Sequence, residues 1–129
     1  MNVHKPLHRV SSADPDDPRV VATELRAPTG ARQMEIEWSD GHTSVYPHRL
    51  LRGFCPCARC QGHDGPLSFK VGGALELRTI EPVGSYAVRL GWSDGHQTGI
   101  YSFRYLRALC PCETCTGGDD LTQQHFERL

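Results

Sequence analysis

The chain has 129 residues, a formal net charge of −1 and an isoelectric point near 6.6. With 38% hydrophobic residues, it suits one small globular domain rather than several. The near-neutral charge lacks the strong positive field that drives binding to nucleic acids and anionic membranes, so neither is expected as a partner.

Residues 1–19 carry the run SSADPDDP and show neither helical nor strand periodicity, which predicts a disordered N-terminal tail. Their basic residues are not followed by the apolar stretch of a signal peptide, and no run of about 18 apolar residues occurs in the sequence. We therefore expect a cytoplasmic protein. The domain is expected over residues 20–118, with a C-terminal tail over residues 119–129.

Two strands are predicted after the tail. Residues 20–27, VVATELRA, form the first, and a turn around Pro28–Gly30 leads into the second. Apolar residues alternate along the second strand with the period of a half-buried strand: Met34, Ile36 and Trp38. Residues 39–42, Ser-Asp-Gly-His, then predict a tight hairpin turn, because glycine tolerates a positive φ.

A returning strand and a short helix complete this first unit. His42 opens the strand, and Pro47 can occupy the first turn of the helix. The apolar face of the helix consists of Leu50, Leu51 and Phe54. The helix leads directly into a cluster of cysteines.

The same order of elements recurs, because residues 35–62 align with residues 89–118. Both stretches contain WSDGH, a Tyr, the pattern R-x-L-R, CPC and a last Cys. Residues 74–80 supply the additional strand, and Ser102 is the expected N-cap of the second helix. The predicted fold is a small α+β domain, mainly antiparallel, made of two pseudo-symmetric β-hairpin, short-helix and Cys-loop repeats.

The alignment changes its offset once. The offset is 54 before Gly99 and 55 after it, so one extra residue lies between Thr98 and Tyr101. In a β-rich stretch a single extra residue predicts a β-bulge.

Two CPCxxC clusters contain all six cysteines: Cys55, Cys57 and Cys60, and Cys110, Cys112 and Cys115. In a reducing compartment such tight clusters indicate metal ligands or redox groups rather than structural disulfides. The proline stiffens each loop, which lowers the entropy lost when three thiolates converge on one ion. Structural zinc takes four ligands in a tetrahedron, commonly Cys₃His or Cys₄, so a histidine is needed from elsewhere.

Three histidines are candidates for the fourth ligand. His63 could complete the first cluster locally, but Gly118 stands at the matching place in the second. His42 and His96 occupy identical places in the repeated WSDGH. If the units pack about a pseudo-twofold axis, each histidine can serve the cysteines of the other unit. The alternative is that both are polar turn residues that hydrogen-bond their hairpins.

The motifs W-x-DGH and LR-x-x-CPCxxC, with residues 80–109, resemble the γ-butyrobetaine hydroxylase-like N-terminal domain family over about residues 20–116. This family occurs alone in bacteria, at the N-terminus of γ-butyrobetaine and trimethyllysine dioxygenases, and fused to Mrp-type iron–sulfur carriers. In the dioxygenases the first CPCxxC and the histidine of the second hairpin bind a structural zinc. The resemblance therefore implies a site of Cys55, Cys57, Cys60 and His96.

The second cluster departs from the dioxygenase members, which do not keep it as a full triad. Internal symmetry alone predicts a second zinc held by His42 and three cysteines, Cys110, Cys112 and Cys115. The alternative is three free or redox-active thiols.

An oxygenase is not expected, because its iron site needs an H-x-D/E pair and a distal histidine on a much larger β fold. We expect no such pair in this chain, because the repeated Asp-Gly-His places the acid before the histidine. We expect a non-enzymatic domain with one or two zinc ions that acts as an interaction or adaptor module for a protein partner. The alternatives are an accessory role in iron–sulfur cluster or metal transfer, although each triad is one thiolate short, and a thiol redox or zinc-release sensor.

Overall fold

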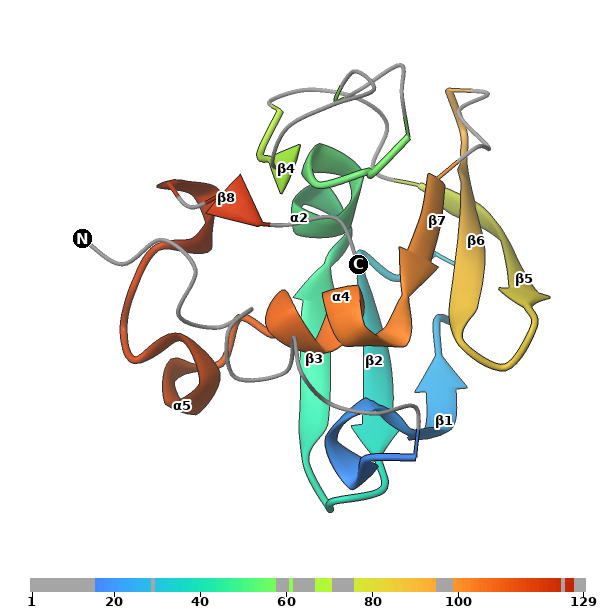
Figure 1. Cartoon of the computed structure of the whole chain (residues 1–129). Helices are drawn as coiled ribbons and strands as arrows, with labels where there is room; N and C mark the ends of the chain where they lie inside the picture. Colours follow the sequence, from blue (N-terminus) through green and yellow to red (C-terminus); the bar gives the residue numbers. More distant parts are fainter. Residues whose placement is uncertain are drawn as a thin grey trace.

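The computed structural model describes residues 16–28, 30–57, 61, 67–70, 76–94, 99–123 and 125–126. Two three-stranded antiparallel sheets dominate it, in the orders β1-β2-β3 and β5-β6-β7 (Figure 1). The first sheet contains β1 (Ala22–Arg26), β2 (Gln33–Trp38) and β3 (Thr43–Pro47). The second contains β5 (Leu77–Val83), β6 (Ala87–Trp92) and β7 (Gly99–Ser102). The predicted α+β class with mainly antiparallel strands is confirmed.

In each sheet, the apolar residues that alternate along the central strand have buried side chains, as the sequence predicts. In β2 the buried side chains are Met34, Ile36 and Trp38. In β6 they include Val88, Leu90 and Trp92. Gly41 has φ +90° in the first hairpin turn, where the amide of Trp38 donates to the carbonyl of His42 at 2.8 Å. This turn fixes the position of His42, which immediately precedes β3.

Short helices follow each hairpin. Helix α2 (His48–Gly53) begins after Pro47, and α4 (Phe103–Ala108) begins after Ser102, whose hydroxyl accepts the amide of Tyr105 at 3.0 Å. The N-cap predicted at Ser102 is therefore confirmed, whereas Pro47, which was expected within the first turn of its helix, ends β3 and is the N-cap of α2. A further helix, α5 (Glu113–Thr116), overlaps the end of the second CPCxxC. None of the helices in the described ranges has the length and apolar character that a membrane crossing requires.

Each helix packs on the sheet of the other half. Trp38 of the first sheet meets Phe103 of α4 edge to face, and Trp92 of the second sheet meets His48 of α2 in the same way. The Tyr46 hydroxyl donates to the carbonyl of Leu106, and the Tyr101 hydroxyl donates to the carbonyl of Leu51 at 2.6 Å. The same two kinds of contact therefore occur in both directions between the halves.

The register of the second sheet corrects the predicted bulge. In the first sheet Ile36 pairs with Ser44, and in the second Leu90 pairs with Gly99, with regular pairing through to Ser102. Gly99 therefore already occupies the place of Ser44. The extra residue lies before Gly99, in the longer connection after Trp92, because a hairpin loop absorbs an insertion at less cost than a paired strand.

Both ends of the described chain reach the core. The 3-10 helix η1 (Pro18–Val20), capped by Asp17, buries Val20, although its first residues fall within the stretch assigned to the tail. At the other end, the 3-10 helix η2 (Leu121–Gln123) precedes β8 (His125–Phe126), which pairs with β4 (Leu67–Ser68). Leu121 and Phe126 are buried, so this part of the expected C-terminal tail packs into the domain.

Candidate metal centre

One histidine and three cysteines from distant parts of the chain converge beside α5: His42, Cys110, Cys112 and Cys115. Their ligand atoms all lie within 4.8 Å of one another. The Nε2 atom of His42 is 3.3 Å from the Cys110 Sγ and 3.5 Å from each of the other two sulfurs. The imidazole nitrogen therefore stands above a triangle of three sulfurs, the arrangement of a tetrahedral Cys₃His site.

The turn before β3 positions the histidine. The carboxylate of Asp40 accepts the backbone amide of His42 at 3.1 Å, which fixes the residue as it leaves the turn. Asp40 also pairs with Arg107 of α4 at 3.0 Å, and Arg107 lies three residues before Cys110. The ion pair thus links the segment that carries the imidazole to the helix that leads into the thiols.

Helix α5 positions the cysteines. Cys110 follows α4 and is fully buried. Cys112 is the N-cap of α5, and its sulfur accepts the amide of Cys115 at 3.4 Å. Gly117 then ends the helix in the left-handed conformation, with φ +66°. One short helical turn therefore directs the last two sulfurs toward His42.

The thiols interact strongly with one another. The contact with Cys115 is the largest of several hydrogen-bonding effects that together lower the pKa of Cys110 to about 4, against the effect of burial, which acts to raise it; Ser44 and His42 contribute in the same direction as Cys115. The same contact with Cys110 raises the pKa of Cys115, with burial acting in the same direction. One thiolate is thus favoured, and a second is opposed by the charge of the first. A bound cation removes this repulsion, so the donor set fits a metal ion.

Two residues behind Cys110 were not predicted as part of the site. The indole Nε1 of Trp38 donates to the hydroxyl of Ser44 at 2.8 Å, and Ser44 is fully buried next to Cys110. The repeat gave no signal for Ser44, because the residue that takes its place in the second sheet is Gly99. Trp38 itself was predicted only as an apolar residue on the inner face of a half-buried strand, and its burial is confirmed.

The first cluster is described only in part. Cys55 and Cys57 are buried, whereas Cys60 and the candidate ligands His63 and His96 lie outside the described residues. The five described cysteines form no disulfide with one another.

The surroundings of Cys55 match those of the second cluster. Arg52 pairs with Asp94 at 3.1 Å, and these two residues correspond to Arg107 and Asp40. Arg52 and Arg107 therefore each bind a carboxylate of the opposite half. Gly99 lies against Cys55, because a Cβ on this glycine would stand 2.6 Å from the Cys55 Sγ.

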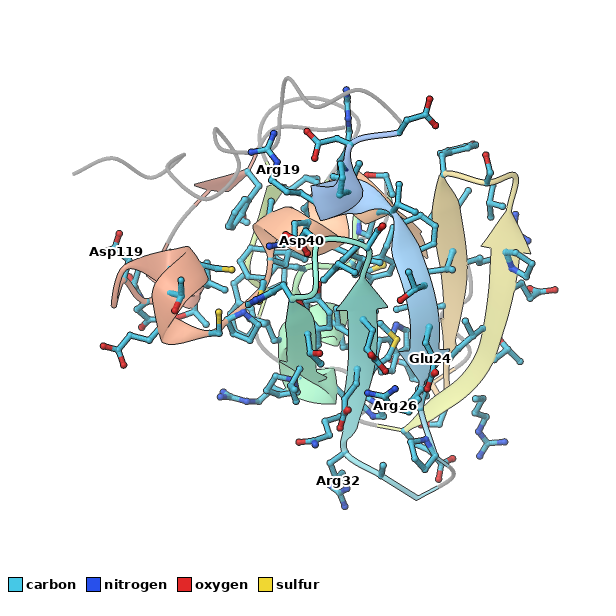
Figure 2. The ribbon with its side chains drawn as sticks, turned by 90° about the horizontal axis from the view of Figure 1, so that it is seen from below. Arg19, Glu24, Arg26, Arg32, Asp40 and Asp119 are labelled. Atoms are coloured by element: carbon cyan, nitrogen blue, oxygen red, sulfur yellow. The ribbon has the colours of Figure 1, made fainter. Side chains whose placement is uncertain are left out.

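Figure 2 shows two charged groups outside this centre. Glu24 and Arg26 lie side by side on β1, where Arg26 also pairs with Glu35 at 2.9 Å and with Glu37. Arg19 lies near Asp40, and the carbonyl of Arg19 accepts from Arg107 at 3.1 Å. The second contact connects η1 to the ion pair that positions His42.

The expectation that an H-x-D/E pair is missing needs a correction. Residues 125–127, His-Phe-Glu, do match that pattern. Phe126 between them is fully buried in β8, and Glu127 lies outside the described residues. The two small sheets also differ from the large double-stranded β fold that such iron sites occupy.

Residues 25–107 match a family model described as gamma-butyrobetaine hydroxylase-like, N-terminal. A crystal structure from Acidithiobacillus ferrooxidans ATCC 23270, described as a protein of unknown function in the DUF971 family, is 40% identical. That match covers 75% of this chain and 100% of the other, with a TM-score of 0.62. Two NMR solution structures are also similar. One is 35% identical, covers 74% of this chain and 70% of the other, and has a TM-score of 0.59. The second is 27% identical, covers 70% and 72%, and has a TM-score of 0.55.

Proposed function

The chain belongs to the γ-butyrobetaine hydroxylase-like N-terminal domain family, and we propose that it is a non-catalytic zinc-binding domain that serves as an adaptor for a protein partner. His42, Cys110, Cys112 and Cys115 hold one zinc ion in this proposal. When bound, the zinc supplies a cross-link between the first hairpin and the segment after α4, which come from different halves of the chain.

The distances at His42 carry the proposal. Zinc bonds of about 2.0–2.1 Å to nitrogen and about 2.3 Å to sulfur, at tetrahedral angles, separate the nitrogen from each sulfur by about 3.6 Å. The three separations from Nε2 are 3.3, 3.5 and 3.5 Å. The side chains thus stand where the ligands of one tetrahedral ion belong.

This spacing favours a single ion over an iron–sulfur cluster. A cluster distributes its protein ligands over several iron atoms bridged by sulfide, so ligands on different irons stand further apart than those of one ion. All four ligand atoms here lie within 4.8 Å of one another. An iron–sulfur cluster would therefore require these four side chains to move apart, whereas a single zinc ion would not.

A second zinc at the first cluster is part of the proposal. Its ligands are Cys55, Cys57, Cys60 and His96, of which two are described. The Arg52–Asp94 ion pair supports it, because Asp94 lies two residues before His96 and Arg52 three before Cys55, as in the other half. The close approach of β7 to the Cys55 sulfur at Gly99 also supports it.

The donor set argues for a structural rather than a catalytic metal. A catalytic zinc keeps one position open for water, whereas three cysteines and one histidine fill all four positions. Unpaired cysteines stay reduced in a reducing compartment, so clustered thiolate ligands support a cytoplasmic location. The net charge of −1 supports a protein partner over a nucleic acid or a membrane.

Partial exposure of two ligands favours zinc-release sensing as a second candidate. Cys112 and Cys115 are half-buried, whereas Cys110 is fully buried. Hydrogen peroxide can take two electrons from such a thiolate pair and, with two protons from the solvent, form one disulfide and two waters, which releases the zinc. Unchanged zinc content after mild peroxide treatment would exclude this role.

The proposal is tested by elemental analysis of protein purified without added metal. We expect zinc in the parent protein, one ion fewer per chain in His42→Ala, and one ion fewer in the double variant Cys55→Ser, Cys57→Ser. Thr43→Ala, an exposed neighbour of His42, is the matched control and should keep the parent content. A zinc content that His42→Ala leaves unchanged would overturn the proposed site.

A further inference from the structure

A buried pair of side chains lies behind Cys110 and takes no part in the metal ligation proposed above. The Nε1 of Trp38 donates to the Ser44 hydroxyl at 2.8 Å, and the two residues are 2% and 0% exposed. An indole N–H can donate but cannot accept. The Ser44 oxygen is therefore the acceptor in this bond, and its own proton is left to be donated elsewhere.

Two acceptors are within hydrogen-bonding reach of that proton. Ser44 lies next to the Cys110 sulfur and the Tyr46 hydroxyl, and its hydroxyl acts to lower the pKa of both groups. The Tyr46 hydroxyl directs its own proton to the carbonyl of Leu106. Once Cys110 is a thiolate, the sulfur is the stronger acceptor, because hydrogen bonds to ionised groups are roughly twice as strong as neutral ones.

The other half of the chain has a different residue at this place. Gly99 pairs with Leu90 as Ser44 pairs with Ile36, and a Cβ at Gly99 would stand 2.6 Å from the Cys55 sulfur. No serine fits there in the present packing. The hydroxyl is therefore a feature of the Cys110 side and is not required by the strand pairing itself.

We infer that Ser44, oriented by Trp38, is a positioning residue of the metal centre: its hydroxyl donates to the Cys110 thiolate, fixes the direction of that sulfur and strengthens its hold on the metal. This inference rests on the proposed Cys₃His centre. A hydrogen bond to a ligating sulfur draws electron density away from it and restricts its rotation, and loss of such outer contacts typically weakens metal binding by about 10–100-fold.

The experiment compares Ser44→Ala with the parent, both carrying Cys55→Ser and Cys57→Ser so that only this centre binds metal. Zinc affinity is measured by competition with a chromophoric chelator, and Co²⁺ replaces zinc for spectroscopy. We expect roughly tenfold weaker zinc binding in Ser44→Ala. We also expect the sulfur-to-cobalt charge-transfer band to move to longer wavelength, because a sulfur without the hydrogen bond gives up an electron more easily.

Two further variants separate this role from simple packing. Ser44→Ala leaves the Trp38 N–H without its acceptor, so the double variant Trp38→Phe, Ser44→Ala removes both partners and should show the same band shift. Trp38→Phe alone keeps the hydroxyl and should show a smaller shift. Thr43→Ala, exposed on the same strand, should show none.

The outcomes distinguish the inference from the proposed function. If the parent binds no Co²⁺ or zinc at this centre, the proposed function fails and the inference with it. If Ser44→Ala binds zinc as tightly as the parent and keeps the same charge-transfer band, only the inference fails. A lower thermal stability of Ser44→Ala with an unchanged band would also overturn it, because that is the signature of packing alone.

Discussion

The Asp40 carboxylate forms a two-point ion pair with the Arg107 guanidinium, at 3.0 and 3.2 Å. The side chain of Arg107 is 11% exposed and that of Asp40 is 26% exposed, so water screens the pair less than it screens an ion pair on the open surface. Arg107 also lies over the ring of Trp38, 5.6 Å from its centre. One cation therefore holds together the turn before His42, the indole behind Cys110 and the helix before Cys110.

Asp40→Asn should weaken zinc binding at the His42 centre by roughly tenfold. Asparagine can still accept the His42 amide, so the turn survives, but the charge that holds Arg107 is lost. The affinity is measured by chelator competition in a background without Cys55 and Cys57. Asp94→Asn removes the equivalent ion pair in the other half and should leave this affinity unchanged, whereas equal effects of the two variants would contradict a local role for Asp40.

Removal of zinc should lower the melting temperature by at least about 10 °C, because in small domains metal binding contributes directly to folding free energy. The measurement is a thermal melt followed by circular dichroism, with and without a strong chelator under reducing conditions. Added zinc should restore the original melting temperature. The same chelator should have a smaller effect on His42→Ala, and an equal effect on both proteins would contradict a contribution from this centre.

Alkaline pH should destabilise the domain through Tyr46 and Tyr101. Burial raises the pKa of each phenol well above 10 in the folded protein. Below about pH 10 both states keep these protons and stability does not depend on them. Above that pH the unfolded state loses protons that the folded state retains, so stability falls as pH rises, by up to about 1.4 kcal/mol per pH unit for each tyrosine.

Variants show which tyrosines are responsible for the fall of the unfolding free energy at alkaline pH. Urea unfolding at several pH values on both sides of about 10, the ordinary pKa of tyrosine, gives the slope of the unfolding free energy against pH. Tyr46→Phe and Tyr101→Phe should each remove about one tyrosine's share, in addition to the cost of a lost buried hydrogen bond. Tyr86→Phe is the control, because this side chain is 60% exposed, and it should leave the slope unchanged. A slope that survives both buried variants would contradict this assignment.

Local patterns in the sequence predicted the elements of both halves. Alternation around Ile36 and Leu90, and the signals at Pro47 and Ser102, are local features, and they placed the strands and helices within a few residues. The pairing of β4 with β8 and the burial of Phe126 were not predicted, because a two-residue strand has no periodicity and its partner lies far away in sequence. The insertion before Gly99 was misplaced because an alignment gives no register.

In the metal centre too, the features that can be read along the chain were predicted, and those that depend on tertiary packing were not. Spacing and duplication brought His42 into the candidate set with the second cysteine cluster, since both features can be read along the chain. The contributions of Asp40, Arg107 and Ser44 depend on how α4 crosses the first sheet. That crossing is set by the packing of Trp38, Tyr46 and their neighbours, which no single segment of sequence specifies.

Gly99→Ala should disrupt the Cys55 side of the domain. The added Cβ would stand 2.6 Å from the Cys55 sulfur and 3.1 Å from the Tyr101 ring, and both atoms belong to buried groups with little room to move. Overpacking of this kind costs about 1–3 kcal/mol, so we expect a lower melting temperature together with zinc loss from the first cluster. Zinc bound by the His42 centre should remain.

A double-mutant cycle shows whether the clash with Cys55 is the cause. If it is, Gly99→Ala should cost less in a Cys55→Ala background, because the smaller side chain leaves space for the new methyl group, and the two effects will not add. Melting temperatures are compared in metal-free protein, so that zinc loss does not enter the comparison. Additive effects would contradict the clash with the Cys55 side chain as the cause, and the close approach to Cys55 would then not explain why a glycine stands there.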